Sequence, residues 1–516
     1  MNQLPLHRYG RLGLYLTVFV TGASVMVIEL LGTRLIAPFY GASLYVWSAL
    51  IAVTMIALAV GYFIGGRWAD NAQRTGLSMV IGLAGLLTLL IPGLARPVLL
   101  ATDPLGLRLG ALTSAMLLFA PSLSLLGMVG PFAIKLATNR LEGIGANSGS
   151  IYAVSTLGSV AGTLLLGFYL FPLVGSREIL LGLGCVLLLL AVIVALYEHY
   201  QLKLNAALVS SLLLVAIGLA FLPKIIDAGS AETPASGFQI QSEQESLYGK
   251  VRVIDQAAHD LRILTSDASA IGAANISDGQ SRLSYQDIVG LLPAMVPNMR
   301  RALIVGLGAG HMAKVLHDQY GIVTDTLEID PAVAIAAQDY FGFKPTGRAI
   351  VGDARYEIRH LTGPYDLIIH DCFTGGTEPA HLLTVETLTQ LRGLLANNGL
   401  LALNFVAFAN GQSKALASVS QTLAAVFSQQ VLFISEPGKD FNDFIFIAAK
   451  HSIDTAPNTL RPEQTAWLKE RRHSINNSKG VVLTDNLNPL EYLQTAKAEY
   501  YRRFVVDWLG ADLLVR

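Results

Sequence analysis

The chain has 516 residues, of which 53% are hydrophobic and only 14% are charged. Ordinary globular domains carry about 25% charged residues, so this composition excludes a chain that is solvated by water throughout. The net charge of -1 argues against nucleic-acid binding driven by bulk electrostatics. The two cysteines, Cys185 and Cys372, are too few for a disulfide framework and indicate reduced thiols in a cytoplasmic active domain.

Residues 1–222 are predicted to form a multi-pass helical membrane domain. About seven apolar runs in this region are long enough to cross a hydrocarbon core of about 30 Å. The runs lie near residues 13–36, 46–66, 77–97, 109–134, 149–173, 178–197 and 204–222. We therefore expect this domain to contact the lipid bilayer of the inner cell membrane.

The composition changes after Leu222. Residues 223–242, PKIIDAGSAETPASGFQIQS, are polar and contain Gly, Pro and Ser, which is typical of a linker. From residue 243 to residue 516 the pattern of short apolar runs and helical segments predicts a soluble α/β domain.

A glycine-rich turn follows the first buried strand expected in the α/β part of the chain. The sequence RALIVGLGAG, residues 301–310, places Gly306, Gly308 and Gly310 after an apolar run, and HMAKVLHDQY continues as a helix. A strand, a tight turn and a helix N-terminus bring backbone N–H groups and the positive end of a helix dipole to a bound ligand. This turn therefore predicts a nucleotide site.

Acidic residues end the next three predicted strands. Glu328 ends VTDTLE, Asp353 comes just before Ala354 after GRAIVG, and Asp371 ends YDLIIHD. Glu328 lies about 20 residues beyond the glycines, where dinucleotide folds place the acid that binds ribose hydroxyls. Ligands bind outside the carboxyl ends of parallel strands, so three successive acids there make helix capping alone improbable. Without a second phosphate loop, S-adenosylmethionine or a relative fits better than NAD.

Residues from about Ser246 to Ala448 resemble the spermidine synthase (polyamine aminopropyltransferase) family. The motifs LEID, GDA and DLIIHD correspond to its ribose, adenine and catalytic strand ends, and LSYQDIVGLLPAM resembles its Tyr-containing helix. ESLYGKVRVID is similar to the small β-rich segment that leads the family's domain, and VLTDNLNPLE to its late acidic motif. The resemblance implies a Rossmann-like α/β transferase domain of the S-adenosylmethionine type. A membrane bundle ahead of such a domain resembles the membrane-fused spermidine synthase-like group.

The resemblance also implies roles for individual residues. Asp371 would accept the proton in aminopropyl transfer, and Tyr285 would help to orient the amine. Decarboxylated S-adenosylmethionine, or S-adenosylmethionine itself, would be the co-substrate, bound by Gly306, Gly308, Gly310, Glu328, Asp353 and Ala354. The acceptor would be a small-molecule amine, putrescine or a related compound, bound by Tyr248, Gln286 and Thr374. We expect no prosthetic group and no metal, and a homodimer is compatible with the resemblance.

Four positions depart from the family pattern, Gly249, Gln286, Ala309 and Thr374, and the last two leave the function open. The acid that holds the donor's amino group is replaced by Ala309, and the second acid for the amine is replaced by Thr374. The first reading is a membrane-bound aminopropyltransferase. The second is another S-adenosylmethionine-dependent transferase, such as a methyltransferase acting on a membrane-associated substrate. The third is a transporter or sensor whose α/β domain binds a nucleoside or polyamine without turnover.

The orientation in the membrane rests on two conflicting arguments. Basic residues place the N-terminus in the cytoplasm by the positive-inside rule, and seven spans would then export the α/β domain. An aminopropyl donor is not expected outside the cytoplasm. We therefore predict a cytoplasmic α/β domain in spite of the charge distribution.

Overall fold

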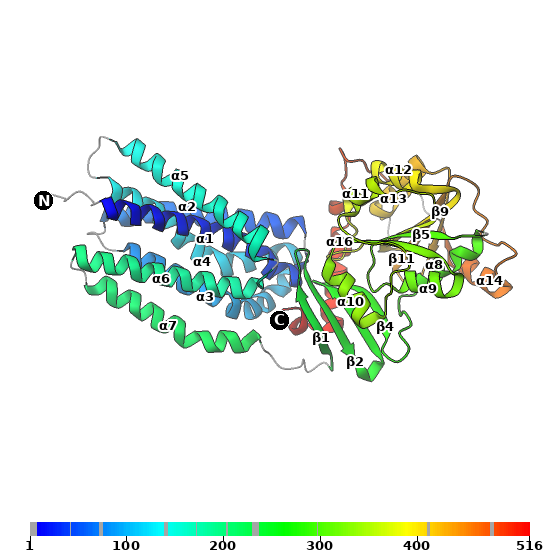
Figure 1. Cartoon of the computed structure of the whole chain (residues 1–516), viewed down its shortest axis with the longest axis horizontal. Coiled ribbons are helices and arrows are strands. Elements are labelled where there is room, and N and C mark those ends of the chain that lie inside the picture. The colour runs from blue at the N-terminus through cyan, green and yellow to red at the C-terminus, as the bar shows by residue number, and fades with distance from the viewer. Residues whose placement is uncertain are drawn as a thin grey trace. The chain divides into compact units, whose positions relative to one another are not determined.

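The computed structural model describes residues 8–41, 43–71, 76–138, 143–171, 173–202, 205–229, 237–296, 298–409, 413–474 and 479–515. The chain divides into two compact units (Figure 1). The first comprises Met1–Glu232 with Ala511–Arg516, and the second comprises Thr233–Gly510. The predicted order, a helical domain followed by an α/β domain, is confirmed.

The first unit is built from long apolar helices. They are α1 (Arg8–Tyr40), α2 (Leu44–Asn71), α3 (Leu77–Thr102), α4 (Gly106–Ala137), α5 (Ile144–Leu165), α6 (Ser176–Leu202) and α7 (Asn205–Gly229), with η1 (Asp103–Leu105), the π-helical η2 (Leu166–Leu170) and the C-terminal α17 (Ala511–Leu514). By length and composition, six helical stretches among the described residues could cross a membrane. The longest of them, Leu77–Ala137, has 61 residues and contains both α3 and α4.

Hydroxyl pairs show that α3 and α4 form an antiparallel hairpin. The hydroxyls of Thr102 and Ser114 are 2.6 Å apart close to the turn, and those of Thr88 and Ser122 are 2.7 Å apart farther along both helices. Because the partners separate in sequence on both sides of the turn, the two helices run in opposite directions. The 61-residue stretch is therefore two helical passes joined by η1.

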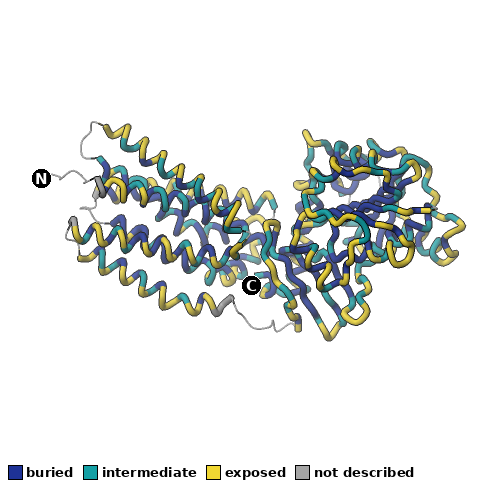
Figure 2. Tube along the Cα trace, in the orientation of Figure 1, coloured by how far each residue is buried: buried dark blue, intermediate teal, exposed yellow. Residues whose placement is uncertain are grey.

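Exposed residues recur along these helices (Figure 2), and many of them are large and apolar. Leu157, Phe168 and Leu189 are examples of large apolar residues that are more than half exposed. Exposed apolar area of this extent on long, weakly charged helices suits contact with lipid. The predicted linker, residues 223–242, overlaps the end of α7 and the start of the first strand.

The second unit begins with a small antiparallel sheet. Its strands are β1 (Gln239–Glu245), β2 (Lys250–Gln256), β3 (Leu261–Ser266) and β4 (Ser269–Asn275), paired in that order. Its short connections include η3 (Ala257–His259). Val251, Val253 and Leu264 pack with Val333 in one apolar cluster, which attaches this sheet to helix α10 (Pro331–Phe341).

The main sheet has eight strands in the order β12-β10-β11-β9-β8-β5-β6-β7. The strands are β5 (Arg301–Val305), β6 (Val323–Glu328), β7 (Ala349–Val351), β8 (Tyr365–His370), β9 (Leu395–Phe408), β10 (Gln429–Ile434), β11 (Phe441–Ala449) and β12 (Arg472–His473). Strands β5 to β9 are parallel, and β10, β11 and β12 pair antiparallel. The chain order reverses between β5 and β8, where open α/β sheets bind their ligands.

Helices cover both faces of this sheet (Figure 1). They are α8 (Tyr285–Met295), α9 (His311–Tyr320), α10, α11 (Ala354–Glu357), α12 (Val385–Leu394), α13 (Lys414–Val426), α14 (Pro462–Arg471), α15 (Leu490–Leu493) and α16 (Thr495–Leu509), with the short η4 (Ile358–His360) and η5 (Ala380–Leu382). Consecutive residues of β8 point to opposite faces of the sheet, so Ile368 enters one core and Ile369 enters the other. Parallel strands that are buried on both faces give the continuous apolar runs seen in the sequence.

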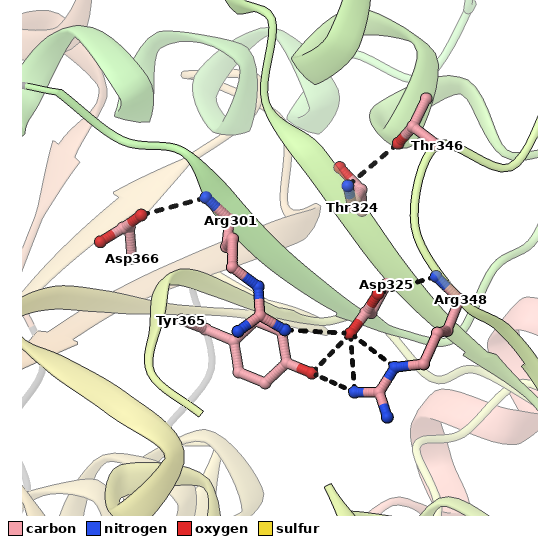
Figure 3. Close-up of polar contacts among 7 residues, drawn as sticks. All are labelled: Arg301, Thr324, Asp325, Thr346, Arg348, Tyr365 and Asp366. Atoms are coloured by element: carbon pink, nitrogen blue, oxygen red, sulfur yellow. Dashed lines mark hydrogen bonds and ion pairs between the residues drawn. The ribbon is translucent and has the colours of Figure 1, made fainter. Parts of the chain in front are cut away.

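A polar cluster ties together the amino ends of the parallel strands (Figure 3). Asp325 accepts hydrogen bonds from the Tyr365 hydroxyl at 2.7 Å and from the Arg348 guanidinium at 2.9 Å. Burial alone would raise the pKa of Asp325, but these bonds and the backbone N–H of Arg348 outweigh it and lower the pKa. This cluster lies at the amino ends of the strands, and the acids predicted to bind ligand lie at the carboxyl ends. Its role is therefore to hold the strands together.

Candidate active site

The glycine turn after β5 passes very close to the end of β8. Gly306 has a φ of 94°, and a Cβ there would lie 2.2 Å from the backbone oxygen of Asp371. Gly308 has a φ of 53° and approaches the backbone oxygen of Ile271, while Gly310 caps α9 with a φ of 77°. Only glycine tolerates these conformations and approaches. The turn therefore begins directly beside the end of β8, at Asp371.

Glu328, at the end of β6, is fixed by two backbone N–H groups. Its Oε2 accepts from Leu307 at 3.1 Å and its Oε1 from Asp330 at 3.0 Å. Burial raises the pKa of Glu328, and these hydrogen bonds partly offset that effect. A carboxylate offers about four acceptor positions, so lone pairs remain for the hydroxyls of a ribose.

Asp353 caps helix α11. Its Oδ1 accepts from the backbone N–H of Arg355 at 2.7 Å and of Tyr356 at 3.3 Å. Ala354 is the first residue of that helix. Capping thus accounts for Asp353 in the structure, and the ligand-binding roles of both residues stay predictions.

Tyr285 and Asp371 meet across the end of the sheet. The hydroxyl of Tyr285, at the start of α8, donates to Asp371 Oδ2 at 2.6 Å, and Gln286 Nε2 donates to that hydroxyl at 3.2 Å. Burial raises the pKa of Tyr285 well above its ordinary value, so this residue stays a hydrogen-bond donor at neutral pH. Burial also raises the pKa of Asp371, although hydrogen bonds from Tyr285 and Asn404 counteract it. Three of the predicted residues are therefore in one hydrogen-bonded group.

Asn404 and Asp443 complete this group, and the sequence interpretation missed them. Asn404 on β9 donates through Nδ2 to Asp371 Oδ1 at 3.1 Å and to Asp443 Oδ1 at 3.2 Å. Burial raises the pKa of Asp443 to about 6, and the nearby charge of Asp371 adds to that shift. Each residue interrupts an apolar strand, in LLALNFVAF and in FNDFIFIAA, and this interruption is the signal that could have revealed them.

The loop after β8 is held to α16 by a buried ion pair. Glu378 and Lys497 form this pair, and both side chains are almost fully buried. Gln494 accepts a hydrogen bond from the backbone N–H of Glu378 at 3.2 Å. The aromatic rings of Phe373 and Tyr501 meet edge to face beside this contact, with centroids 5.0 Å apart. These contacts fix the segment that follows the end of β8.

Two predicted acceptor-binding residues are not brought into this group. Thr374 is exposed and its backbone N–H donates to Thr377 at 2.8 Å. The side chain of Tyr248 is 45% exposed in the turn between β1 and β2. No polar contact in the described part of the chain joins either residue to Asp371, because both lie in turns outside the strand ends.

The position of the missing donor acid is apolar. Ala309 is only 4% exposed and belongs to the cluster that contains Val251 and Ala332. A Cβ placed on Gly272 of β4 would lie 2.6 Å from the Cβ of Ala309. Ala309 therefore packs closely against β4, and Gly272 provides the space for its methyl group. Among the described residues, no group of three or more His, Cys, Asp or Glu side chains could hold a metal ion.

Comparisons with known proteins identify transferases. The chain is 30% identical over 254 residues to the N-terminal histidine N-methyltransferase of Emericella nidulans, covering 44% of each chain. It is 34% identical over 199 residues to the polyamine aminopropyltransferase of Vibrio vulnificus, covering 36% of this chain and 64% of that one. The crystal structure of a probable spermidine synthase from Corynebacterium glutamicum aligns with a TM-score of 0.39 and 19% identity, covering 50% of this chain and 94% of that one. No family model matches the chain.

The chain spans 44% and 64% of these two curated relatives, less than two thirds of either. Both are named as transferases, in agreement with the predicted enzyme class. The names support the predicted likeness to the spermidine synthase family, and they also include a methyltransferase.

Proposed function

We propose that the chain is a membrane-bound transferase that moves an aminopropyl group from decarboxylated S-adenosylmethionine to an amine. The observation that carries the proposal is the buried group in which Tyr285 and Asn404 both donate hydrogen bonds to Asp371. This group lies where the chain order of the sheet reverses, beside the glycine turn and near Glu328.

Aminopropyl transfer needs a base beside the acceptor nitrogen. An alkyl amine has a pKa of about 10.4 and is mostly protonated at pH 7, but only the neutral nitrogen can attack carbon. The new bond forms between this nitrogen and the aminopropyl carbon next to sulfur, the C–S bond breaks, and its electron pair neutralises the sulfonium. The nitrogen's proton passes to Asp371, whose raised pKa makes it a better base than an exposed aspartate. Tyr285 and Asn404 keep both carboxylate oxygens oriented.

The donor would be held by the glycine turn and Glu328. Backbone groups at the N-terminus of α9 and the dipole of that helix favour a polar ligand. Glu328 would accept hydrogen bonds from the ribose hydroxyls with the lone pairs left by its two backbone donors. Asp353 and Ala354 would lie beside the adenine, as the family resemblance implies.

The proposal includes a location. We infer that the α/β domain is cytoplasmic and that the apolar helices anchor it in the inner membrane, because the donor is a cytoplasmic metabolite. A reporter fused after Arg516 is expected to be active in its cytoplasmic form. Activity only of an exported reporter would contradict this orientation. Gel filtration with light scattering in detergent would test the proposed homodimer.

The experiment that tests the activity compares both donors with one panel of amines. Detergent-purified protein is incubated with decarboxylated S-adenosylmethionine or S-adenosylmethionine, and the nucleoside product is identified by mass spectrometry. Methylthioadenosine that requires both the decarboxylated donor and an amine is the expected product. The proposal fails if neither donor gives an amine-dependent product.

A second candidate, N-methyl transfer from S-adenosylmethionine, is favoured by Ala309. An apolar residue replaces the acid that would bind the amino group of the decarboxylated donor, and the Emericella nidulans relative is named as an N-methyltransferase. The same base would serve a nitrogen acceptor. S-adenosylhomocysteine formed in the same assay would select this candidate.

A further inference from the structure

The group around Asp371 contains more negative charge than aminopropyl transfer to a single amine needs. Asp371 would serve as the base, yet a second half-buried carboxylate, Asp443, stands beside it. Asn404 Nδ2 contacts one oxygen of each carboxylate, so these two oxygens lie no farther apart than the sum of 3.1 Å and 3.2 Å, which is 6.3 Å.

No cationic side chain is paired with either aspartate within the described residues. Lys497 lies close enough for its charge to interact with that of Asp443, but its ammonium contacts Glu378 in the buried ion pair. One ammonium therefore interacts with two carboxylates, those of Glu378 and Asp443. Two half-buried negative charges without a cationic partner carry a desolvation cost, so a cationic ligand would stabilise this arrangement.

Acceptor atoms beside Asp443 are left without donors. Asn404 must turn its NH2 group toward the two carboxylates, because its oxygen would be repelled there. Its Oδ1 is then buried and has no hydrogen-bond partner among the residues described. The second oxygen of Asp443 has only a long contact of 3.5 Å from the Ser435 hydroxyl. An ammonium carries three N–H donors and would satisfy acceptors of this kind.

Aromatic rings lie near Asp443. Tyr501 lies close enough to Asp443 for that carboxylate's charge to raise the tyrosine's pKa, although burial is the larger cause. Its ring is 6.3 Å from that of Phe441 and 5.0 Å from that of Phe373, centroid to centroid. Aromatic faces attract ammonium groups and exclude water from them.

We propose that Asp443 and Asn404 form a second ammonium site that selects acceptors with two positive charges. The reacting amine would lie at Asp371, and a second ammonium, a short carbon chain away, would lie at Asp443. This inference rests on the proposed function. It assigns to β9 and β11 the charge recognition that the sequence resemblance places at position 374, where Thr374 is exposed and uncharged. Asp443 acts here as a specificity-determining residue and does not take part in the bond changes.

The test compares putrescine, butylamine and aminobutanol, which share a four-carbon chain and differ in the second group. Binding to the full-length protein is measured by calorimetry with methylthioadenosine present, so the readout does not need turnover. Putrescine is expected to bind about tenfold to a hundredfold more tightly than either of the others, as a charged hydrogen-bonded contact would give. The Asp443→Asn variant should lose most of this preference. Asp454→Asn is the control and should keep the preference for putrescine, because Asp454 follows the end of β11 whereas Asp443 lies near its start.

Each outcome has a separate meaning. Equal binding of putrescine and aminobutanol by the unmodified protein overturns the second ammonium site without any variant. A preference that survives Asp443→Asn in a folded variant also overturns it. A preference that is lost in this variant, with no nucleoside product from either donor, keeps the ammonium site and refutes transfer. Methylthioadenosine formation without a preference keeps transfer and refutes the site.

Discussion

Replacing Asp371 by asparagine should remove the base with almost no change in side-chain size. The amide oxygen of asparagine can still accept the hydrogen bond from Tyr285 that the carboxylate receives at 2.6 Å. A positioned general base contributes about a hundredfold to ten-thousandfold to a rate, which corresponds to about 3 to 5 kcal/mol of activation free energy. We expect kcat/KM for methylthioadenosine formation to fall by this factor, with donor binding retained.

The pH profile provides the second readout for this variant. The base acts when it is deprotonated, so activity should rise with pH through the pKa of Asp371. Because burial raises that pKa, the acidic limb should lie above the ordinary aspartate value of about 3.9. The limb should be absent from the residual activity of Asp371→Asn. Product is measured by chromatography across the pH series, with Asp454→Asn as the control.

A retained rate would refute the reasoning. If folded Asp371→Asn keeps more than about a tenth of the wild-type kcat/KM, the carboxylate does not supply general-base catalysis of the expected size. An unchanged acidic limb in the variant would assign that limb to another group.

Two further predictions concern stability, and a third concerns donor binding. Lys497→Met leaves Glu378 buried and unpaired, so unfolding free energy should fall by about 3 to 5 kcal/mol, and adding Glu378→Gln should restore much of it in thermal melts; no recovery would contradict the pairing. The pKa of Asp325 is lowered in the folded protein, so its stabilisation is present above the unfolded value of about 3.9 and is lost as pH falls through the folded value. Asp325→Asn should flatten this acid-side loss, and an identical pH dependence would refute the assignment. Gly306→Ala would place a Cβ 2.2 Å from a backbone oxygen and should abolish donor binding, whereas Gly393→Ala, where a Cβ meets nothing within 4 Å, should retain binding.

The strand ends of the site could be predicted because each belongs to one local pattern. An apolar run followed by a glycine or an acid marks the carboxyl end of a parallel strand, and this pattern located Gly306, Glu328 and Asp371. It did not reveal that Asp353 also caps α11, since a cap and a ligand-binding acid look alike in sequence. Tyr285 came from the family resemblance, and its contact with Asp371 joins residues 86 positions apart.

The other half of the site depends on sheet order, which no local pattern contains. Asp443 lies near the start of β11, and it reaches the same edge as Asp371 only because β11 runs antiparallel to β9. Asn404 lies in the middle of an apolar strand and has no neighbouring turn to mark it. The length of α7 beyond residue 222 was missed because polar and apolar residues alternate irregularly there.

The shared amide of Asn404 links the two carboxylates energetically. Each negative charge disfavours ionisation of the other, and the charge of Asp371 contributes to the raised pKa of Asp443. A bound ammonium at Asp443 would offset this repulsion and favour the ionised form of Asp443. Asp371 would keep the raised pKa that burial gives it and that suits a base. A monoamine would leave Asp443 without that compensation, so specificity for a doubly charged acceptor would come from Asp443 and proton transfer from Asp371, with Asn404 joining the two.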